Sequence, residues 1–200
     1  MSRDRFGLVV SPRSPGLWLF SGSVLMILLV HLAEFLYPGY SVSENYISDL
    51  GVGPMPSRAV FTVAIIVFGL MSLISSALMR RSHPKSSIWF LLAASGIGAI
   101  GVGTFNEDGV PIVHAVFALM AFLFGNLAAI YSYRIVRSPL SYIFVLLGIM
   151  GLAALALFAG NTYLGLGAGG MERIIFYSAM LWTLGFGAYL LGEEGRSAPG

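Results

Sequence analysis

The chain has 200 residues, of which 57% are hydrophobic and only 10% charged, and its mean hydropathy is +0.85. A soluble domain of this length carries far more charge on its surface, so this composition excludes an ordinary soluble protein and predicts an integral membrane protein. The formal net charge of +2 is too small to indicate nucleic-acid binding, and the lack of cysteine excludes disulfides, thiolate metal ligands and cysteine nucleophiles.

Six apolar segments follow one another along the chain, and each is long enough to cross the hydrocarbon core of a bilayer. They predict six transmembrane helices, at residues 17–37, 59–79, 86–105, 112–135, 140–160 and 171–191. Prolines and glycines mark short connections between them. The predicted fold is therefore all-α: one compact transmembrane domain over residues 1–200, with a cytoplasmic segment at 1–16 and a cytoplasmic tail at 192–200.

The basic residues predict the orientation of this bundle. One side collects nine of the eleven lysines and arginines, namely Arg3, Arg5, Arg13, Arg80, Arg81, Lys85, Arg134, Arg137 and Arg196. The other side has Arg58 and Arg173. By the positive-inside rule both termini are cytoplasmic. Most of the acids lie at the opposite, outer ends of the segments.

The first segment ends with His31 and Glu34, which lie three residues apart and share one helix face. Counting back from Pro38, His31 lies about 10 Å below the end of the segment. Ionisable side chains at such a depth normally face the bundle interior or a water-filled cavity. The pair is therefore interpreted either as a metal-ligand or acid–base pair, or as a structural hydrogen bond with Glu34 reaching interfacial water.

Polar residues crowd the connection at 40–51. Ser41 and Glu44 have the spacing of a capping box, and Gly51 is suited to end a helix. The sequence thus predicts a short interfacial helix between the first two spans. Two interpretations stay open: a helix solvated on its polar face, or a lid that presents three side chains to the outer mouth of the bundle, Asn45, Ser48 and Asp49.

The connection before the fourth segment carries two acids, Glu107 and Asp108, and the fourth segment opens with His114. A histidine with carboxylates in reach serves as a base, a proton relay or a metal ligand. We predict that Asp108 and His114 form such a functional pair. Glu107 is interpreted as part of a solvated acidic turn.

The last segment begins with Glu172 and Arg173 after a run of glycines. An acid in the first turn suits the helix dipole. Arg173 is expected to pair with an outer acid, or alternatively to hold an anionic lipid headgroup. Asn126, halfway along the fourth segment, is predicted to make an interhelical hydrogen bond.

The third segment contains a G-x-G-x-x-G string at Gly96, Gly98 and Gly101. A dinucleotide fingerprint needs a preceding strand and an acidic residue about 20 positions further on, whereas this string lies inside an apolar span. Small residues let neighbouring membrane helices approach closely. The string therefore predicts helix packing.

Three motifs stand out: Ile47-Ser48-Asp49-Leu50-Gly51 after the first span, Phe105, Asp108 and His114 around the start of the fourth, and Gly170-Met171-Glu172-Arg173 at the start of the last. They resemble the motifs of the family catalogued as domain of unknown function 998. The resemblance covers nearly the whole chain and implies a multi-span protein of a prokaryotic cell membrane. It implies no activity. Asn106 replaces the proline of the family pattern, which implies a different local turn.

This outer cluster of histidines, carboxylates, serine and arginine is the material for hydrolysis of a lipid at the membrane surface. In the metal-assisted hypothesis three side chains hold a zinc-type divalent ion: His31, His114 and Asp108, with Asp49 as an alternative ligand. A bound water is the nucleophile and Glu34 accepts its proton. Ser48 is the nucleophile in a serine version, which lacks a nucleophile elbow.

The hypothesis assigns the predicted site residues to three groups. The catalytic group is Glu34, Ser48 and Asp49; the metal group is His31, His114 and Asp108; the headgroup-binding group is Asn45, Glu172 and Arg173. Two other classes stay open. One is a non-catalytic lipid-binding or scaffold protein, and the other is a small-solute transporter, which requires ionisable groups near the bilayer midplane. Membrane lipids are the expected partners, and no nucleic acid is expected.

Overall fold

The computed structural model describes residues 14–197, the last four of them by their backbone alone. Most of the predicted terminal segments at 1–16 and 192–200 lies outside the described side chains. Six long helices make up the fold: α1 (Pro15–Phe35), α2 (Ser57–Ser82), α3 (Ile88–Thr104), α4 (Pro111–Tyr131), α5 (Leu140–Ala159) and α6 (Gly167–Ser197). Two short 3-10 helices, η1 (Ser48–Gly51) and η2 (Ser132–Arg134), complete the described part of the chain, which contains no strand.

Five of the six long helices are long and apolar enough to cross a membrane. The exception is α3, which has 17 residues and is apolar but shorter. The predicted all-helical, polytopic membrane fold is thus confirmed, and the predicted segments agree with the helices to within a few residues at most ends.

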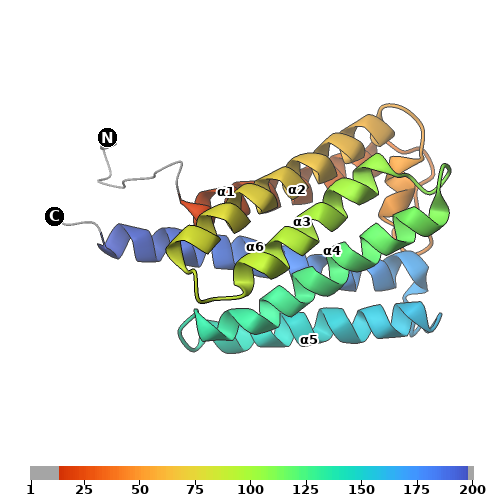
Figure 1. Ribbon diagram of the computed structural model, residues 1–200. Coiled ribbons are helices and arrows are strands. Elements are labelled where there is room, and N and C mark those ends of the chain that lie inside the picture. Colours follow the sequence, from red (N-terminus) through yellow and green to blue (C-terminus); the bar gives the residue numbers. More distant parts are fainter. Residues whose placement is uncertain (1–13, 198–200) are drawn as a thin grey trace.

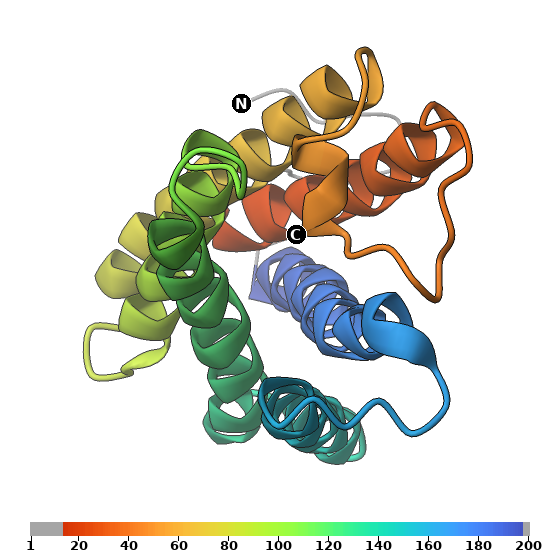
Figure 2. The same ribbon diagram turned by 90° about the vertical axis from the view of Figure 1, so that its right-hand side faces the viewer.

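The helices form a ring in which each packs against its neighbours in the chain (Figure 1). The ring is closed by α6, which packs against α1 and α5 and also touches α4. Figure 2 looks along the bundle from one end. At this end, which the sequence predicts to be extracytoplasmic and which is called the outer end below, lie η1 and the α3–α4 and α5–α6 connections. At the opposite end α1 begins and α6 ends.

Glycines set the spacing of the second, third and fourth helices. A Cβ on Gly96 would lie 2.9 Å from the carbonyl oxygen of Gly69 on α2, and one on Gly98 would lie 2.4 Å from the backbone nitrogen of Ala121 on α4. The G-x-G-x-x-G string is therefore a packing surface, as predicted. Asn126 also behaves as predicted, because its amide donates to the carbonyl of Ile175 on α6 at 3.5 Å and to that of Phe122 in its own helix.

The last helix begins at Gly167, four positions before the predicted start. The glycine run is helical because it packs directly on the α1–α2 connection: the Gly169 N–H donates to the carbonyl of Ser43 at 2.9 Å. A Cβ on Gly169 would lie 2.0 Å from the carbonyl oxygen of Asn45. These glycines let two backbones approach closely, which is a different role from that of a flexible loop.

The connection from 36 to 56 contains less helix than the sequence predicts. Its capping turn does form, since the Ser41 hydroxyl accepts the Glu44 N–H at 3.4 Å. The chain does not continue as an α-helix because the N–H groups of Tyr46 and Ile47 donate to the carboxylates of Asp49 and Glu172 instead of to earlier carbonyls. Helical backbone is limited to the four residues of η1.

Candidate functional site

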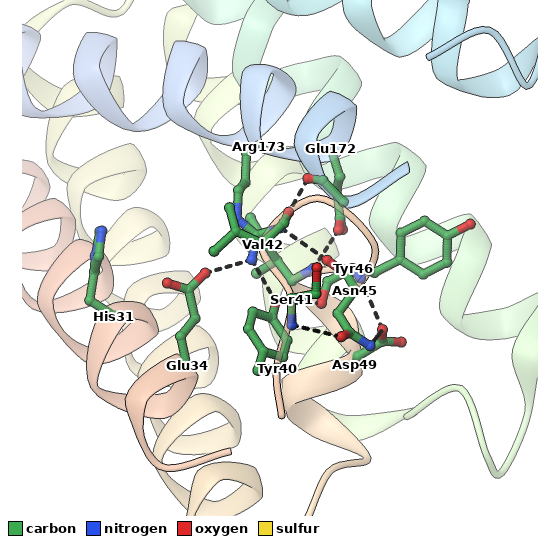
Figure 3. A network of polar contacts seen from close by, with 12 residues as sticks. His31, Glu34, Tyr40, Ser41, Val42, Asn45, Tyr46, Asp49, Glu172 and Arg173 are labelled. Atoms are coloured by element: carbon green, nitrogen blue, oxygen red, sulfur yellow. Dashed lines mark hydrogen bonds and ion pairs between the residues drawn. The ribbon is translucent and has the colours of Figure 1, made fainter. Parts of the chain in front are cut away.

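Arg173, in the first turns of α6, is the centre of a buried polar network at the outer end (Figure 3). Its Nη2 donates to Glu34 of α1 at 2.6 Å and to the hydroxyl of Tyr40 at 2.6 Å. Its Nη1 donates to three backbone carbonyls within 3.0 Å, those of Val42, Asn45 and Gly169. One guanidinium thus ties the start of α6 to the end of α1 and to the connection between α1 and α2.

Tyr40 extends this network into the connection. Its hydroxyl accepts from Arg173 and donates to the carbonyl of Tyr46 at 2.7 Å. Burial is the main cause that raises the pKa of Tyr40, so the hydroxyl keeps its proton and stays a donor at physiological pH. Two alternatives were predicted for Arg173, and the structure shows the first of them, pairing with an acid, which is Glu34.

Asn45 and Asp49 fold the connection on itself. The Asp49 carboxylate accepts from the Asn45 amide at 3.0 Å and from the Tyr46 N–H at 2.9 Å. The Asn45 side chain in turn accepts the Ser41 N–H at 3.0 Å. Both side chains therefore bind groups of their own loop, and the lid interpretation, with either of them presented to a ligand, stays a prediction.

Glu172, the neighbour of Arg173, is buried and points to the other side of the loop (Figure 3). Its carboxylate accepts the N–H of Ile47, just before η1. Because Ile47 and Leu50 are themselves buried in the core, this bond seats η1 on the bundle. Ser48, the first residue of η1, comes next to Glu172 as a result, and both line the same pocket.

His114 pairs with Glu107, and not with Asp108 as predicted. Its Nε2 lies 3.2 Å from the Glu107 carboxylate, and its Nδ1 lies 2.8 Å from the carbonyl oxygen of Phe105. Asp108 is exposed at the tip of the connection. The cause is a four-residue turn over 106–109, in which the Gly109 N–H donates to the Asn106 side chain at 3.0 Å and to the Asn106 backbone carbonyl at 3.3 Å. This turn directs Glu107 back to α4 and Asp108 outward.

Glu107 is anchored as a carboxylate. The hydrogen bond from His114 is the main cause that holds its pKa below the usual range, and a hydrogen bond from Ser48 adds to the effect. A carboxyl with a lowered folded-state pKa contributes stability that is present above its ordinary pKa and lost as pH falls through the folded value.

Acidification therefore has a specific expected effect at Glu107. We expect thermal stability in detergent to decline as pH falls below the ordinary pKa of a glutamate, about 4.3, and to decline less in Glu107→Gln, which has no carboxylate to protonate. The exposed Glu44→Gln variant is the control and is expected to follow the unmodified protein. Identical acid profiles for all three proteins would contradict this account of the pair.

An open pocket of about 340 Å³, called the outer pocket below, lies between α4, α5 and the polar side chains around His114. Its polar end is lined by Tyr46, Ser48, Glu107, His114 and Glu172. The rest of its wall is apolar and comes from α4 and α5, with Ala115, Ala118, Leu119, Phe122, Leu155, Phe158 and Ala159. The arrangement places two carboxylates, an imidazole and a hydroxyl at one end of an apolar slot, which is the usual pattern of a site for an amphipathic small molecule.

His31 lies away from this pocket and from the Arg173 network. Its ring is exposed, with Nδ1 2.7 Å from the carbonyl oxygen of Ile27 and Nε2 3.2 Å from the hydroxyl of Tyr177. Figure 3 shows Glu34 pointing to Arg173 and His31 apart from both. Of the alternatives for His31, the structure shows the structural hydrogen bond, because the Ile27 carbonyl and the Tyr177 hydroxyl are the partners of its ring.

The predicted metal ligands are consequently not brought together. Among the side chains that the structure describes, no three His, Asp or Glu residues form a group that could hold an ion. His31 and His114 belong to separate hydrogen-bonding sets, and Asp108 joins neither. The ligand set His31, His114 and Asp108 is therefore corrected by the geometry.

Sequence reasoning missed Glu107, Tyr40 and Tyr46. The signal for Glu107 was present, because asparagine and glycine are favoured at the first and last positions of a β-turn, and Asn106 and Gly109 have this spacing. For Tyr40 there was no comparable signal, since its role depends on an arginine 133 positions away. Tyr46 lines the pocket and packs edge-on against Phe158 of α5, a contact that depends on how α5 lies beside the loop.

One of the comparisons with known proteins identifies the family of this chain. A family model described as "Protein of unknown function (DUF998)" matches residues 20–189, which include every group of the outer site. Searches of the curated proteins and of the solved structures found no match. The match covers most of the chain and includes all six helices in whole or in large part. The chain therefore belongs to the DUF998 family of polytopic membrane proteins.

Proposed function

We propose that this protein binds an amphipathic, lipid-like molecule at its outer end. The polar group of the ligand lies against Glu107, His114 and Glu172, and its chain lies in the apolar slot between α4 and α5. The observation that carries the proposal is the shape and lining of the pocket, which joins an ionisable end to an apolar wall. Nearby residues of α4 support a lipid-like occupant, since Ile112, Val116 and Leu119 are 80%, 53% and 51% exposed and apolar.

The charges of the pocket favour a particular class of headgroup. Two carboxylates and one imidazole line it, and none of its lining residues is a lysine or arginine. A phosphate group placed here meets like charge, whereas hydroxyl or ammonium groups donate hydrogen bonds to the carboxylates. The ligand class is therefore a neutral or cationic lipid whose headgroup carries hydrogen-bond donors.

Hydrolysis of this ligand is a second proposal, favoured by the position of Glu172 beside His114 in the same pocket. In it, a water oxygen bonds to the carbonyl carbon of an ester while Glu172 accepts a water proton. The bond to the leaving alcohol then breaks, and protonated His114 donates a proton to the alcohol oxygen, so the products are a fatty acid and an alcohol. The proton that Glu172 accepted passes to His114, which restores both groups. This route uses no metal ion. Glu34 and Asp49, which the sequence placed among the catalytic residues, instead hold the α1–α2 connection in position.

We further propose that all six helices cross the membrane with both termini on the cytoplasmic side. The 17 residues of α3 span about 25 Å, close to the thickness of the hydrocarbon core. It lies between α2 and α4 and runs alongside them (Figure 1). Most of the basic residues whose side chains the structure describes lie at the end where α1 begins and α6 ends, which supports this orientation: Arg80, Arg81, Lys85, Arg134 and Arg137.

Transport has less support than binding. Beneath the outer pocket, two cavities of about 40 and 50 Å³ follow each other into the bundle. They share apolar walls that include Met26, Ile65 and Phe122. Each has room for a few water molecules, and their polar lining is limited to serine, threonine, His114 and Glu172. This is a poor path for a charged solute.

Binding is tested by filling the apolar slot. Dioleoylglycerol with a photoactivatable acyl chain is the probe, offered to the full protein in nanodiscs, and the crosslinked peptide is identified by mass spectrometry. Ala115→Phe places a ring in the slot and is expected to reduce labelling of α4 and α5 at least fivefold. Ala156→Phe is the control, because it makes the same change at an exposed position of α5 that does not line the pocket. Equal labelling in both variants would refute the proposed slot.

Hydrolysis is tested separately from binding. Release of oleate from dioleoylglycerol is measured for the unmodified protein and for Glu172→Gln, which preserves the size and the acceptor for the Ile47 N–H. We expect the variant to retain crosslinking and to lose oleate release at least a hundredfold. Crosslinking without oleate release in the unmodified protein would leave the binding proposal standing and reject the enzymatic one.

A further inference from the structure

A second groove lies at the end opposite to the outer pocket. It is open, has a volume of about 700 Å³, and is lined by His83, Pro84, Lys85 and Ser86 from the α2–α3 connection and by Tyr131, Arg134 and Ile135 from the end of α4 and η2. Figure 1 shows both segments at the end where α1 begins. The proposed outer site takes no part in it, since the two pockets share no lining residue.

The charge of this groove is the reverse of that of the outer pocket. A histidine, a lysine and an arginine line it, and no carboxylate does. None of the ion pairs among the described side chains involves His83, Lys85 or Arg134. Positive groups that converge without a carboxylate partner produce a field that attracts an anion.

Side-chain contacts hold the groove in shape. The guanidinium of Arg134 lies over the rings of Tyr131 and Tyr133, at 5.2 and 5.7 Å from their centres, and its Nε donates to the Tyr133 hydroxyl at 3.2 Å. The Tyr131 hydroxyl accepts the N–H of Ser87 at 2.9 Å, which ties the α2–α3 connection to α4. The arginine and the lysine-bearing loop are therefore placed on either side of one opening.

The surroundings identify the anion as part of a lipid. Trp89 beneath Arg80, together with Tyr131 and Tyr133, forms the aromatic belt typical of a membrane–water interface. Basic pockets between helices at the cytoplasmic boundary bind phosphate-bearing headgroups. We infer that the groove lined by His83, Lys85 and Arg134 binds the phosphate of an anionic membrane lipid such as phosphatidylglycerol. Its volume accommodates the glycerol of that headgroup as well as the phosphate.

The test measures lipid binding by the full purified protein in neutral detergent. Dioleoyl-phosphatidylglycerol and dioleoyl-phosphatidylcholine are titrated separately, and the melting temperature and the lipids retained in native mass spectra are recorded. We expect only phosphatidylglycerol to raise the melting temperature in a concentration-dependent way. Lys85→Gln and Arg134→Gln are each expected to weaken phosphatidylglycerol binding at least fivefold. Lys85→Arg keeps the charge and is expected to retain binding.

Arg58→Gln is the matched control, because it removes an equal charge from an exposed site at the other end of the bundle. It is expected to leave phosphatidylglycerol binding unchanged. Inorganic phosphate at millimolar concentration distinguishes the source of the anion: competition with phosphatidylglycerol supports a shared phosphate site. Phosphate binding without phosphatidylglycerol binding overturns the lipid assignment, and equal loss of binding in Arg58→Gln and Lys85→Gln overturns the groove. Since Lys85 and Arg134 are exposed, the lipid-free melting temperatures of their variants are expected to equal that of the unmodified protein.

Discussion

Arg173→Gln is expected to destabilise the protein by about 3–5 kcal/mol, the usual cost of removing one partner of a buried ion pair. The variant loses the guanidinium that binds Glu34, Tyr40 and three backbone carbonyls. It also leaves Glu34, whose side chain is only 13% exposed, as a charge without its cation. Thermal unfolding in detergent, followed by circular dichroism, measures the effect.

Two further variants separate the charge from the hydrogen bonds. Arg173→Lys keeps the charge but cannot reach five acceptors with one ammonium, so it is expected to recover only part of the stability. Glu34→Gln combined with Arg173→Gln removes the uncompensated carboxylate and is expected to be more stable than Arg173→Gln alone. Arg58→Gln is the control for loss of an exposed charge. If Arg173→Gln unfolds at the same temperature as this control, the network has no structural role.

The second large effect is expected from a methyl group at the α3–α4 contact. Gly98→Ala places a Cβ 2.4 Å from the backbone nitrogen of Ala121 and 2.7 Å from the carbonyl oxygen of Phe117. Because both atoms belong to the backbone, no side-chain rotation relieves the clash and the two helices must separate. We expect a loss of about 1–3 kcal/mol, the usual range for an overpacked core.

Gly192→Ala is the matched control for this substitution. Gly192 also lies within a helix, but a Cβ there meets no atom within 4 Å. Alanine has the higher helix propensity, so the control is expected to be neutral or slightly stabilising. Thermal unfolding in detergent measures the stability of both variants. We expect Gly98→Ala to be less stable than the unmodified protein, and Gly192→Ala to be equally or slightly more stable. Equal behaviour of the two variants would show that α3 and α4 tolerate a wider spacing.

Hydropathy predicted the positions of the helices because each of the six helices is a long, continuous run of mainly apolar residues. The ends of α1 and α5 lie within two residues of the predicted ends. Pro15 is the first residue of α1, and Gly160 directly follows the last residue of α5. The start of α6 was harder to predict. A glycine run indicates a loop by local rules, but here the glycines allow contact with Ser43 and Asn45, and that contact depends on tertiary structure.

Most of the polar side chains that meet at this end were named from the sequence, and the pairing of Arg173 with an acid was one of the predicted alternatives, but the partner of His114 was not predicted. Choosing Asp108 over Glu107 as the partner of His114 ignored the turn that directs the two side chains apart. For His31 the sequence left a functional pair and a structural hydrogen bond open, because the general rule for ionisable residues at this depth does not identify a partner. The partners, Ile27 and Tyr177, are known only from the structure. The carbonyls that bind Arg173 have no side-chain signature, so no sequence pattern reveals them.

The contacts of Arg173 bear on the route by which a ligand reaches the outer pocket. The α1–α2 connection is fastened to α6 by the guanidinium and by the Ile47 bond to Glu172, so this loop and the helix move as one piece. Widening the pocket on the side of this loop requires breaking these buried bonds. The α4–α5 wall consists only of apolar packing, with no such bond across it. In the proposed function, therefore, the ligand diffuses sideways out of the bilayer leaflet into the protein, and it does not need to leave the lipid phase for water.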